Sequence, residues 1–367
     1  MSAVCFYISG HGFGHASRQI EIVNAVGAVS PATRLLIRTS APRWLFERTL
    51  RVPAELLPGE CDTGVVQVDS LRLDATGTIT RAWAFHSTLG ERARQEAATL
   101  REHGVVLAVV DAPPLGCAAA AAASIPSFVA ANFTWDWIYA HYAREASRAP
   151  QLVSALRDAY ALAAGAWRMP LHGGFETVPA VADVPFVARH ARHSRAEVRR
   201  LCGLPANKPL ALLSFGGYGV NDLGLGQVDC LDRWGIVLTH GGRPGAALPA
   251  GVIDVAEDTL YGSGLRYEDL VAAVDVVMTK PGYGIVSECV ANRTAMLYTS
   301  RGRFVEYDVM VSEMPRYLRC RHLEQADLFS GRWGEGLDAV YRAAAPPDQP
   351  STNGAEVIAG MIAERLA

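Results

Sequence analysis

Short apolar runs separated by longer helical patterns recur along the whole chain. Residues 4–8 are apolar and precede a glycine-rich turn, after which Ile20, Val23 and Val26 recur at helical spacing. A short apolar run of this kind is typical of a buried strand, whereas apolar residues three or four apart mark one face of a helix. The same order predicts further strands at 34–38, 65–68, 105–110, 127–130, 210–214, 236–238, 252–255, 274–278 and 295–298.

Strands that alternate with helices predict an α/β protein with doubly wound parallel sheets. One long helix is expected from about residue 82 to residue 103. Between about 165 and 195 the alternation breaks in a stretch rich in proline and glycine, before Ser194 and Glu197 form a capping box that opens a new helix. Such a break is typical of a crossing between domains.

The length of 367 residues exceeds that of one typical domain. We therefore predict two Rossmann-like domains, at 1–185 and 186–345, that face a central cleft. The remaining segment, 346–367, carries an amphipathic helix that we expect to pack back on the N-terminal domain.

The segment 279–290 combines the end of a strand, a glycine turn and the start of a helix. A turn of this kind presents backbone N–H groups and the positive end of a helix dipole to an anion. Lys280 adds a positive charge, and Ser287 and Glu288 follow one turn later, where a carboxylate can accept hydrogen bonds from sugar hydroxyls. The pattern favours a site for a phosphate with a sugar attached, although the turn could also lack a ligand.

Other polar residues follow predicted strands in the first half of the chain. The glycine loop 10–15 superficially matches a dinucleotide fingerprint, but the next strand ends at Thr39 without the acidic residue that would hold a ribose. Asp111 follows the strand at 105–110, and the segment 132–136 follows the strand at 127–130. Because ligands bind beyond the carboxyl ends of parallel strands, these residues are expected at one site.

The overall composition indicates a cytoplasmic protein with small-molecule ligands. A net charge of −3 gives no reason to expect nucleic acid as a partner. No apolar run approaches the roughly 20 residues that span a bilayer, and the chain starts at a strand without a basic leader segment. The seven cysteines form no Cys-x-x-Cys pair, which favours a reducing compartment. The sequence has no Asp-x-Asp motif, so we expect no metal ion and no cofactor.

Five motifs together resemble a known family. They are Gly-His-Gly-Phe-Gly-His-Ala-Ser-Arg at 10–18, Asn-Phe-Thr-Trp-Asp-Trp-Ile-Tyr-Ala at 132–140, Asp-Val-Pro-Phe-Val-Ala-Arg at 183–189, Ser-Phe-Gly-Gly at 214–217 and Lys-Pro-Gly-Tyr-Gly-Ile-Val-Ser-Glu at 280–288. The chain resembles the glycosyltransferase-like N-terminal region of plant L-arabinokinases and their stand-alone bacterial relatives. It is more distantly similar to MurG-type transferases. This resemblance implies the GT-B fold, with two doubly wound domains across a cleft.

The resemblance also implies roles for individual residues. In the C-terminal domain the donor site would comprise Gly216, Gly217, Tyr218, His240, Lys280, Gly282, Tyr283, Gly284, Ser287 and Glu288. In the cleft we expect the acceptor site to comprise Gly12, Phe13, Gly14, Asn132, Trp135, Asp136 and Arg301. The aromatic residues of the segment 135–137 could equally be buried in a core.

Three residues are candidates for the catalytic machinery. An imidazole suits the removal of a proton from an acceptor, and we favour His15 over His11, although either could cap the first helix instead. Asp111 could orient a histidine, bind an acceptor hydroxyl, or serve as a helix cap.

We therefore expect a metal-independent, inverting glycosyltransferase with a histidine base. Its donor would be a nucleotide-diphosphate sugar, with a UDP-sugar as the first choice, and its acceptor a small molecule. Two alternatives stay open: a sugar-nucleotide-binding module without catalysis, and a non-hydrolysing nucleotide-sugar epimerase of the same fold.

Overall fold

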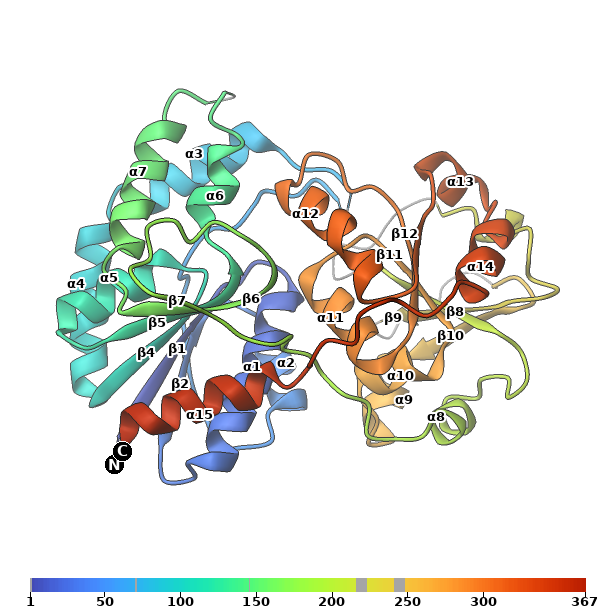
Figure 1. Ribbon diagram of the computed structural model, residues 1–367, viewed down its shortest axis with the longest axis horizontal. Coiled ribbons are helices and arrows are strands. Elements are labelled where there is room, and N and C mark those ends of the chain that lie inside the picture. Colours follow the sequence, from blue (N-terminus) through green and yellow to red (C-terminus); the bar gives the residue numbers. More distant parts are fainter. Residues whose placement is uncertain (1, 70, 145, 216–222, 241–247) are drawn as a thin grey trace.

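The chain forms two α/β domains that lie side by side, as the computed structural model shows (Figure 1). The structure describes residues 2–69, 71–144, 146–215, 223–240 and 248–367, with the exception of the side chain of His240. Each domain is built on one parallel sheet whose strands are largely buried between helices. This arrangement confirms the prediction of two doubly wound sheets.

The N-terminal domain contains a sheet with the strand order β3-β2-β1-β4-β5-β6-β7, and its strand pairings are parallel. Its strands are β1 (Ala3–Ile8), β2 (Arg34–Thr39), β3 (Glu55–Pro58), β4 (Val105–Asp111), β5 (Ser127–Phe133), β6 (Gly165–Gly173) and β7 (Val181–Asp183). Its helices are α1 (Phe13–Val29), α2 (Arg43–Thr49), α3 (Ala75–His86), α4 (Leu89–Glu102), α5 (Pro114–Ala123), α6 (Trp135–Ala140) and α7 (Ala149–Tyr160).

The C-terminal domain repeats this winding, with the strand order β10-β9-β8-β11-β12-β13. Its strands are β8 (Leu210–Ser214), β9 (Gly235–His240), β10 (Val252–Ala256), β11 (Val276–Thr279), β12 (Ala295–Tyr298) and β13 (Cys320–His322). Its helices are α8 (Arg195–Leu201), α9 (Glu257–Gly262), α10 (Tyr267–Ala273), α11 (Tyr283–Asn292), α12 (Val305–Glu313), α13 (Gln325–Ser330) and α14 (Gly334–Tyr341).

The strand order reverses at one point in each sheet, between β1 and β4 and between β8 and β11. A crevice opens at such a point beyond the carboxyl ends of the strands, and ligands of doubly wound sheets bind there. The register pairs Ile8 with Asp111 in the first sheet and Ser214 with Thr279 in the second. Each pair stands at the carboxyl ends of its strands, so the two crevices are framed by residues of the same relative position.

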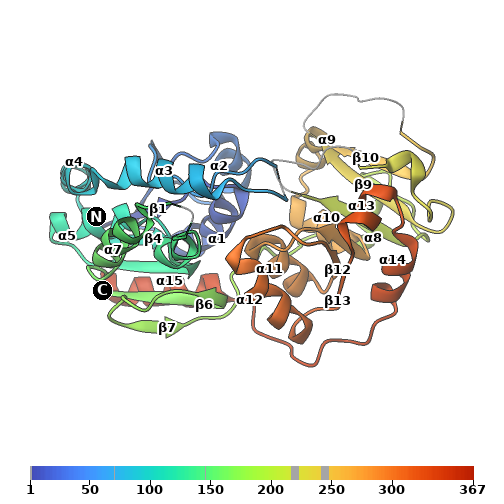
Figure 2. The same ribbon diagram turned by 90° about the horizontal axis from the view of Figure 1, so that it is seen from above.

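The chain passes between the domains twice, and the two crossings are paired. Phe186 N–H donates to Ser351 O over 3.2 Å, and Val187 forms an antiparallel bridge with Asn353. The final helix, α15 (Gly354–Leu366), then lies on the N-terminal domain beside α1 (Figures 1 and 2). Its buried Ile358 and Ile362 belong to the hydrophobic cluster on that face of the first sheet.

Several elements differ from the sequence-based expectations. Residues 65–68 form a single bridge, Gln67 with Leu73, in place of a strand, and the neighbouring strand is β3 instead. The helix expected at 82–103 is interrupted at Ser87 and Thr88, which separate α3 from α4. Four strands were not expected. β3, β7 and β13 are short edge strands with no buried apolar run, and β6 pairs with β5 inside the stretch of 165–195 that was expected to be a crossing between domains.

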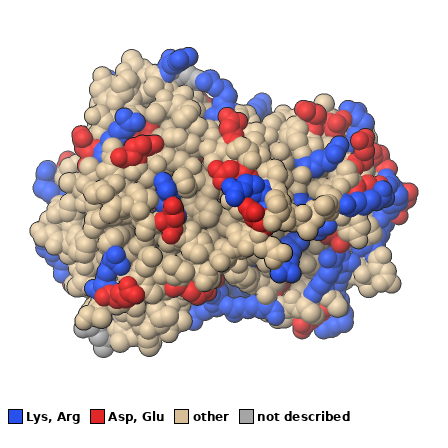
Figure 3. All heavy atoms as spheres, viewed as in Figure 1, with Lys and Arg blue, Asp and Glu red and all other residues tan. Residues whose placement is uncertain are grey.

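The lengths of the helices and the charges on the surface bear on possible partners. None of the described helices is both long and apolar enough to pass through a bilayer. On the face shown in Figure 3, acidic and basic side chains are interspersed over both domains.

Candidate functional site

A cleft of about 200 Å³ lies between the two domains, at the carboxyl ends of both sheets. Eleven residues from the sequence-based site line it: His11, Gly12, Phe13, Gly14, His15 and Trp135 from the N-terminal domain, and Lys280, Gly282, Tyr283, Gly284 and Arg301 from the C-terminal domain. The structure therefore brings together residues that lie up to 290 positions apart in the chain.

The loop from β1 to α1 carries both histidines. Gly12, the residue before α1, has φ of 73°, in the left-handed region that favours glycine. His11 N–H donates to Ser9 Oγ over 3.2 Å, which holds the start of the loop. The loop thus turns sharply into α1, and the first turn of the helix places His15 in the cleft.

His15 forms a buried pair with Asp111 at the end of β4. The distance from His15 Nδ1 to Asp111 Oδ2 is 2.7 Å, and both side chains are buried. A carboxylate at this distance accepts the Nδ1 proton, which leaves the lone pair of the neutral imidazole on Nε2. Burial opposes the ionisation of Asp111, but His15 and Arg18 outweigh it and hold the pKa of the carboxyl below its usual value.

Arg18 binds the other oxygen of the same carboxylate. It lies one helical turn after His15, and its Nη2 donates to Asp111 Oδ1 over 2.5 Å. Its Nη1 donates to Asn132 Oδ1 over 2.8 Å, and Asn132 Nδ2 donates to the carbonyl of Pro170 over 2.6 Å. Asp111 is therefore fixed at both oxygens, which orients the imidazole of His15.

His11 is less buried than His15 and Asp111. Its Nε2 is 3.3 Å from Gln67 Nε2. Burial, followed by the neighbouring His15, Arg301 and Lys280, lowers the pKa of His11 to about 3. His11 is thus uncharged at neutral pH and a weak base, whereas His15 has a carboxylate partner.

The opposite wall of the cleft is the turn between β11 and α11. Lys280 follows β11, and α11 begins at Tyr283 after the extended Gly282. Among the described residues, Lys280 Nζ has no hydrogen-bonding partner, and burial with the nearby Arg301 lowers the pKa of Lys280 to about 7. Arg301 Nη1 lies 3.2 Å from Glu306 Oε1, and its guanidinium stacks on Phe304.

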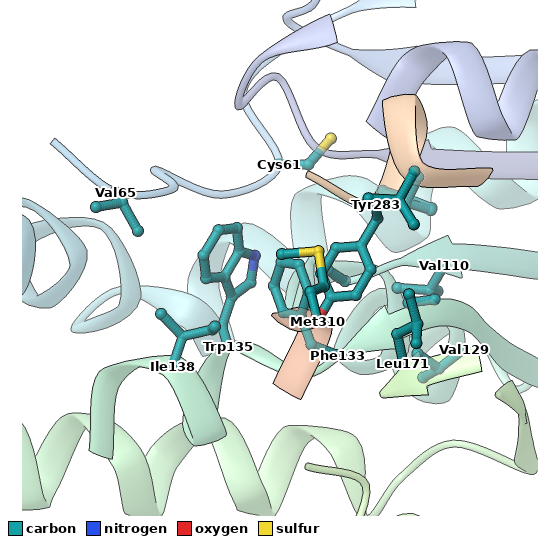
Figure 4. Packing of buried hydrophobic residues seen from close by; sticks show 14 of the residues in the cluster. Cys61, Val65, Val110, Val129, Phe133, Trp135, Ile138, Leu171, Tyr283 and Met310 are labelled. Carbon is teal, nitrogen blue, oxygen red and sulfur yellow. The ribbon is translucent and has the colours of Figure 1, made fainter. Parts of the chain in front are cut away.

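The two domains touch at the glycines of the two helix starts. A methyl group on Gly284 would lie 3.4 Å from the Cα atom of Gly14, so the first turns of α11 and α1 are in near contact. Tyr283 crosses into the N-terminal domain, where its ring stacks on Phe133 at 5.8 Å between centroids (Figure 4). Phe133 in turn lies edge-on to His15 at 5.5 Å. Aromatic packing thus connects the turn before α11 to His15.

Other residues of the sequence-based site stand behind the cleft wall. Glu288 is buried and pairs with Arg189, with 2.7 Å between Arg189 Nε and Glu288 Oε1, and burial raises the pKa of Glu288. Ser287 Oγ donates to the carbonyl of Tyr283 over 2.8 Å. Asp136 is buried on α6 and pairs with Arg157 of α7. The proposed roles of these three residues stay predictions.

Four residues predicted for the donor site fall where no side chain is described. Gly216, Gly217 and Tyr218 lie outside the described residues, and so does the side chain of His240, which ends β9. Within the part of the chain that the structure describes, no three His, Cys, Asp or Glu side chains are grouped to hold a metal ion.

The cleft also contains residues that the sequence reasoning missed. Arg18 was part of the 10–18 motif, and its spacing of three from His15 could have placed it on the same helix face. Glu306 follows Arg301 by five residues, but nothing in the local pattern pointed to it. The others are Val65, Gln67, Phe133, Ile138, Ser214, Phe215, Thr279 and Ile285.

Two facing domains of this winding, with a cleft at the carboxyl ends of both sheets, define the GT-B fold of glycosyltransferases. Solved structures with this fold match the whole chain. The kitacinnamycin glycotransferase matches at a TM-score of 0.65 and 16% identity. The match covers 100% of this chain and 99% of the glycotransferase. UGT2 of Phytolacca americana, solved with UDP-2-fluoroglucose and pterostilbene, matches at a TM-score of 0.59 and 13% identity. The match covers 99% of this chain and 94% of UGT2. MurG of Acinetobacter baumannii matches at a TM-score of 0.52 and 14% identity, and the match covers 99% of this chain and 100% of MurG.

The sequence itself is similar to L-arabinokinase of Arabidopsis thaliana. The two are 29% identical over 368 residues, which cover 98% of this chain and 34% of the plant protein. The chain thus spans about a third of the length of that relative. No protein-family model matches the sequence.

Proposed function

We propose that the chain is a glycosyltransferase that moves a sugar from a nucleotide-diphosphate sugar to a small-molecule acceptor, with inversion and without a metal ion. The observation that carries this proposal is the position of the buried His15–Asp111 pair, which shares one cleft with Lys280 and the start of α11. A base and an anion-binding turn on opposite walls are what a single displacement at a sugar requires.

In the proposed reaction His15 Nε2 accepts the proton of an acceptor hydroxyl. The acceptor oxygen forms a bond to the anomeric carbon while the bond from that carbon to the diphosphate oxygen breaks, and the diphosphate leaves with the electron pair. Asp111 keeps the proton on Nδ1 and stabilises the imidazolium that forms. The attack comes from the side opposite the leaving group, so the anomeric configuration inverts.

The leaving diphosphate would lie at the start of α11. The first backbone N–H groups of α11 have no partner within the helix and lie at the end that faces the cleft, where the helix dipole favours a negative charge. Lys280 and Arg301 add side-chain charges beside it. Preorganised donors of this kind stabilise charge as it develops in the transition state. A UDP-sugar remains our first choice of donor.

Two measurements test the proposal in sequence. The purified protein is titrated calorimetrically with UDP, GDP, dTDP, CDP and ADP in the absence of metal, and we expect one clear binder. Sugars on that nucleotide are then screened with small acceptors. His15→Asn should lower kcat by about 10²–10⁴-fold, the usual contribution of a general base, and leave the affinity for the nucleotide unchanged.

The matched control is His141→Asn, because His141 lies exposed at the end of α6, outside the cleft. This control should keep wild-type kcat. Tight nucleotide binding without turnover on any acceptor would instead favour the non-catalytic sugar-nucleotide-binding module. No binding of any nucleotide would contradict both readings.

A further inference from the structure

Asp62 lies behind the cleft, in the long connection between β3 and α3, and the reaction proposed above does not use it. Its side chain is 3% exposed and does not line the cleft. A carboxyl group buried to this extent is costly unless hydrogen bonds satisfy it. Its two oxygens are both engaged, and each holds a different piece of the cleft wall.

The first oxygen holds the histidine loop. Ser9 Oγ donates to Asp62 Oδ1 over 2.9 Å, and the same Ser9 oxygen accepts the backbone N–H of His11 over 3.2 Å. Because the serine proton is committed to Asp62, its lone pairs face the loop. The position of His11 therefore depends on Asp62 through a single intervening hydroxyl.

The second oxygen holds the largest aromatic residue of the cleft. Trp135 Nε1 donates to Asp62 Oδ2 over 2.7 Å. The indole lies edge-on to the ring of His11 at 5.9 Å and at 6.2 Å from that of His15. An indole N–H can only donate, so its partner must be an acceptor. If the hydrogen bond to Asp62 were lost, the indole could rotate, and the ring face against which both histidines pack would move.

We propose that Asp62 is a positioning residue that clamps His11 and Trp135 in the arrangement that the acceptor contacts. A carboxylate suits this task better than an amide, because both of its oxygens accept hydrogen bonds, whereas an amide has one accepting atom. The inference rests on the proposed function in so far as it concerns an acceptor. Its geometric part, the clamp itself, stands independently of any reaction.

The charge state of Asp62 offers a handle on the clamp. Burial, only partly offset by His15 and the hydrogen bonds from Trp135 and Ser9, raises the pKa of Asp62 to about 6. The other titratable groups around it are His11 in the loop, Asp111 at the end of β4, Tyr139 on α6 and Cys61 beside it. Tyr160 on α7 also responds to its charge.

The first test observes the clamp directly. In protein labelled with ¹⁵N-tryptophan, the indole N–H resonance of Trp135 is assigned by its loss in Trp135→Phe. We expect this resonance at low field, because its acceptor is charged, and we expect it to titrate near pH 6. In Asp62→Asn the shift and the titration should both be lost, while Asp158→Asn, an exposed change on α7, should preserve them.

The second test asks what the clamp does, using the acceptor found in the screen above. Asp62→Asn and Trp135→Phe should each raise the KM for the acceptor about tenfold, the equivalent of one charged hydrogen bond, with the Kd for the nucleotide unchanged. The double variant should be no worse than Asp62→Asn alone, since Trp135→Phe acts on a bond that Asp62→Asn already perturbs. A merely structural carboxyl would lower the stability and the active fraction without changing KM.

The outcomes separate the two hypotheses. An indole resonance that is unchanged in Asp62→Asn would overturn the clamp, whether or not the protein transfers sugar. An unchanged KM for the acceptor in an active Asp62→Asn enzyme would overturn the positioning role. A wild-type protein with the low-field, titrating resonance but no turnover would support the clamp and count against the proposed function.

Discussion

Lys280 should couple the binding of a nucleotide diphosphate to the uptake of a proton. Its side chain stands in the cleft beside Arg301, and its pKa is lowered to about 7. The lysine is therefore largely uncharged in mildly alkaline solution while the cleft is empty. A bound diphosphate would place negative charge beside Nζ and restore the charged form. Binding should then draw one proton from the buffer for each lysine that was neutral beforehand.

The size of the effect follows from the shifted pKa. With a pKa of about 7, roughly a tenth of the lysines are protonated at pH 8, so binding there should take up about 0.9 proton. Between pH 7 and pH 8.5 the Kd for the nucleotide should rise about 16-fold, or about 1.6 kcal/mol. The sign is fixed by the proton uptake: affinity falls as pH rises.

Calorimetry measures this uptake without reference to turnover. The preferred nucleotide is titrated at pH 8 in HEPES and in Tris, whose enthalpies of ionisation differ, and the difference in binding enthalpy gives the number of protons. Lys280→Arg is the matched control, because arginine stays charged throughout this range. It should bind with equal enthalpy in the two buffers and with a Kd that does not change with pH. Equal enthalpies in the wild-type protein would refute the reasoning.

Three further changes probe residues in the wall of the cleft and behind it. If Glu288 holds the ribose, Glu288→Ala should weaken nucleotide binding at least tenfold, about 1.4 kcal/mol. An unchanged calorimetric affinity would assign Glu288 a structural role. In that case the variant should lose only stability, about 1–3 kcal/mol, from the broken pair with Arg189. The raised pKa of Asp62 means that the native state binds more protons than the unfolded chain between about pH 4 and pH 6. The free energy of unfolding should therefore fall as pH rises through this window, by up to about 3 kcal/mol, and urea titrations of Asp62→Asn at pH 4.5 and pH 7 should lack this fall. Tyr283 Oη is buried without a partner among the described residues. Tyr283→Phe should therefore match or exceed the wild-type stability in urea, whereas Tyr283→Ala should lose about 3–5 kcal/mol. A clear loss of stability in Tyr283→Phe would show that the hydroxyl is paired.

The sequence pattern was sufficient for strands that form continuous apolar runs. The strands β1, β4 and β8 are continuous apolar runs because helices cover them on both sides, and such runs predict strands well. Edge strands such as β3 carry no such run and were missed. The strand expected at 65–68 does not form, because Val65 is buried in the wall of the cleft and not in a sheet.

The site was predictable where its residues follow a strand and unpredictable where they depend on partners. His15 and Lys280 were predicted as site residues because each lies in or beside a glycine turn that follows a predicted strand. The contact between His15 and Asp111, in contrast, requires β1 to lie beside β4 with Ile8 opposite Asp111, and strand order cannot be read from periodicity. The pairs that occupy Glu288 and Asp62 are likewise long-range, so no window of the sequence contains them.

The paired crossings between the domains have a mechanical consequence. The two crossing segments run antiparallel and are hydrogen-bonded to each other, so a movement of one domain relative to the other would have to move both segments together. The second crossing continues directly into α15, which is anchored on α1. The helix that bears His15 and Arg18 therefore packs against the element that leaves the second crossing, which links the joint between the domains to the scaffold of the proposed base.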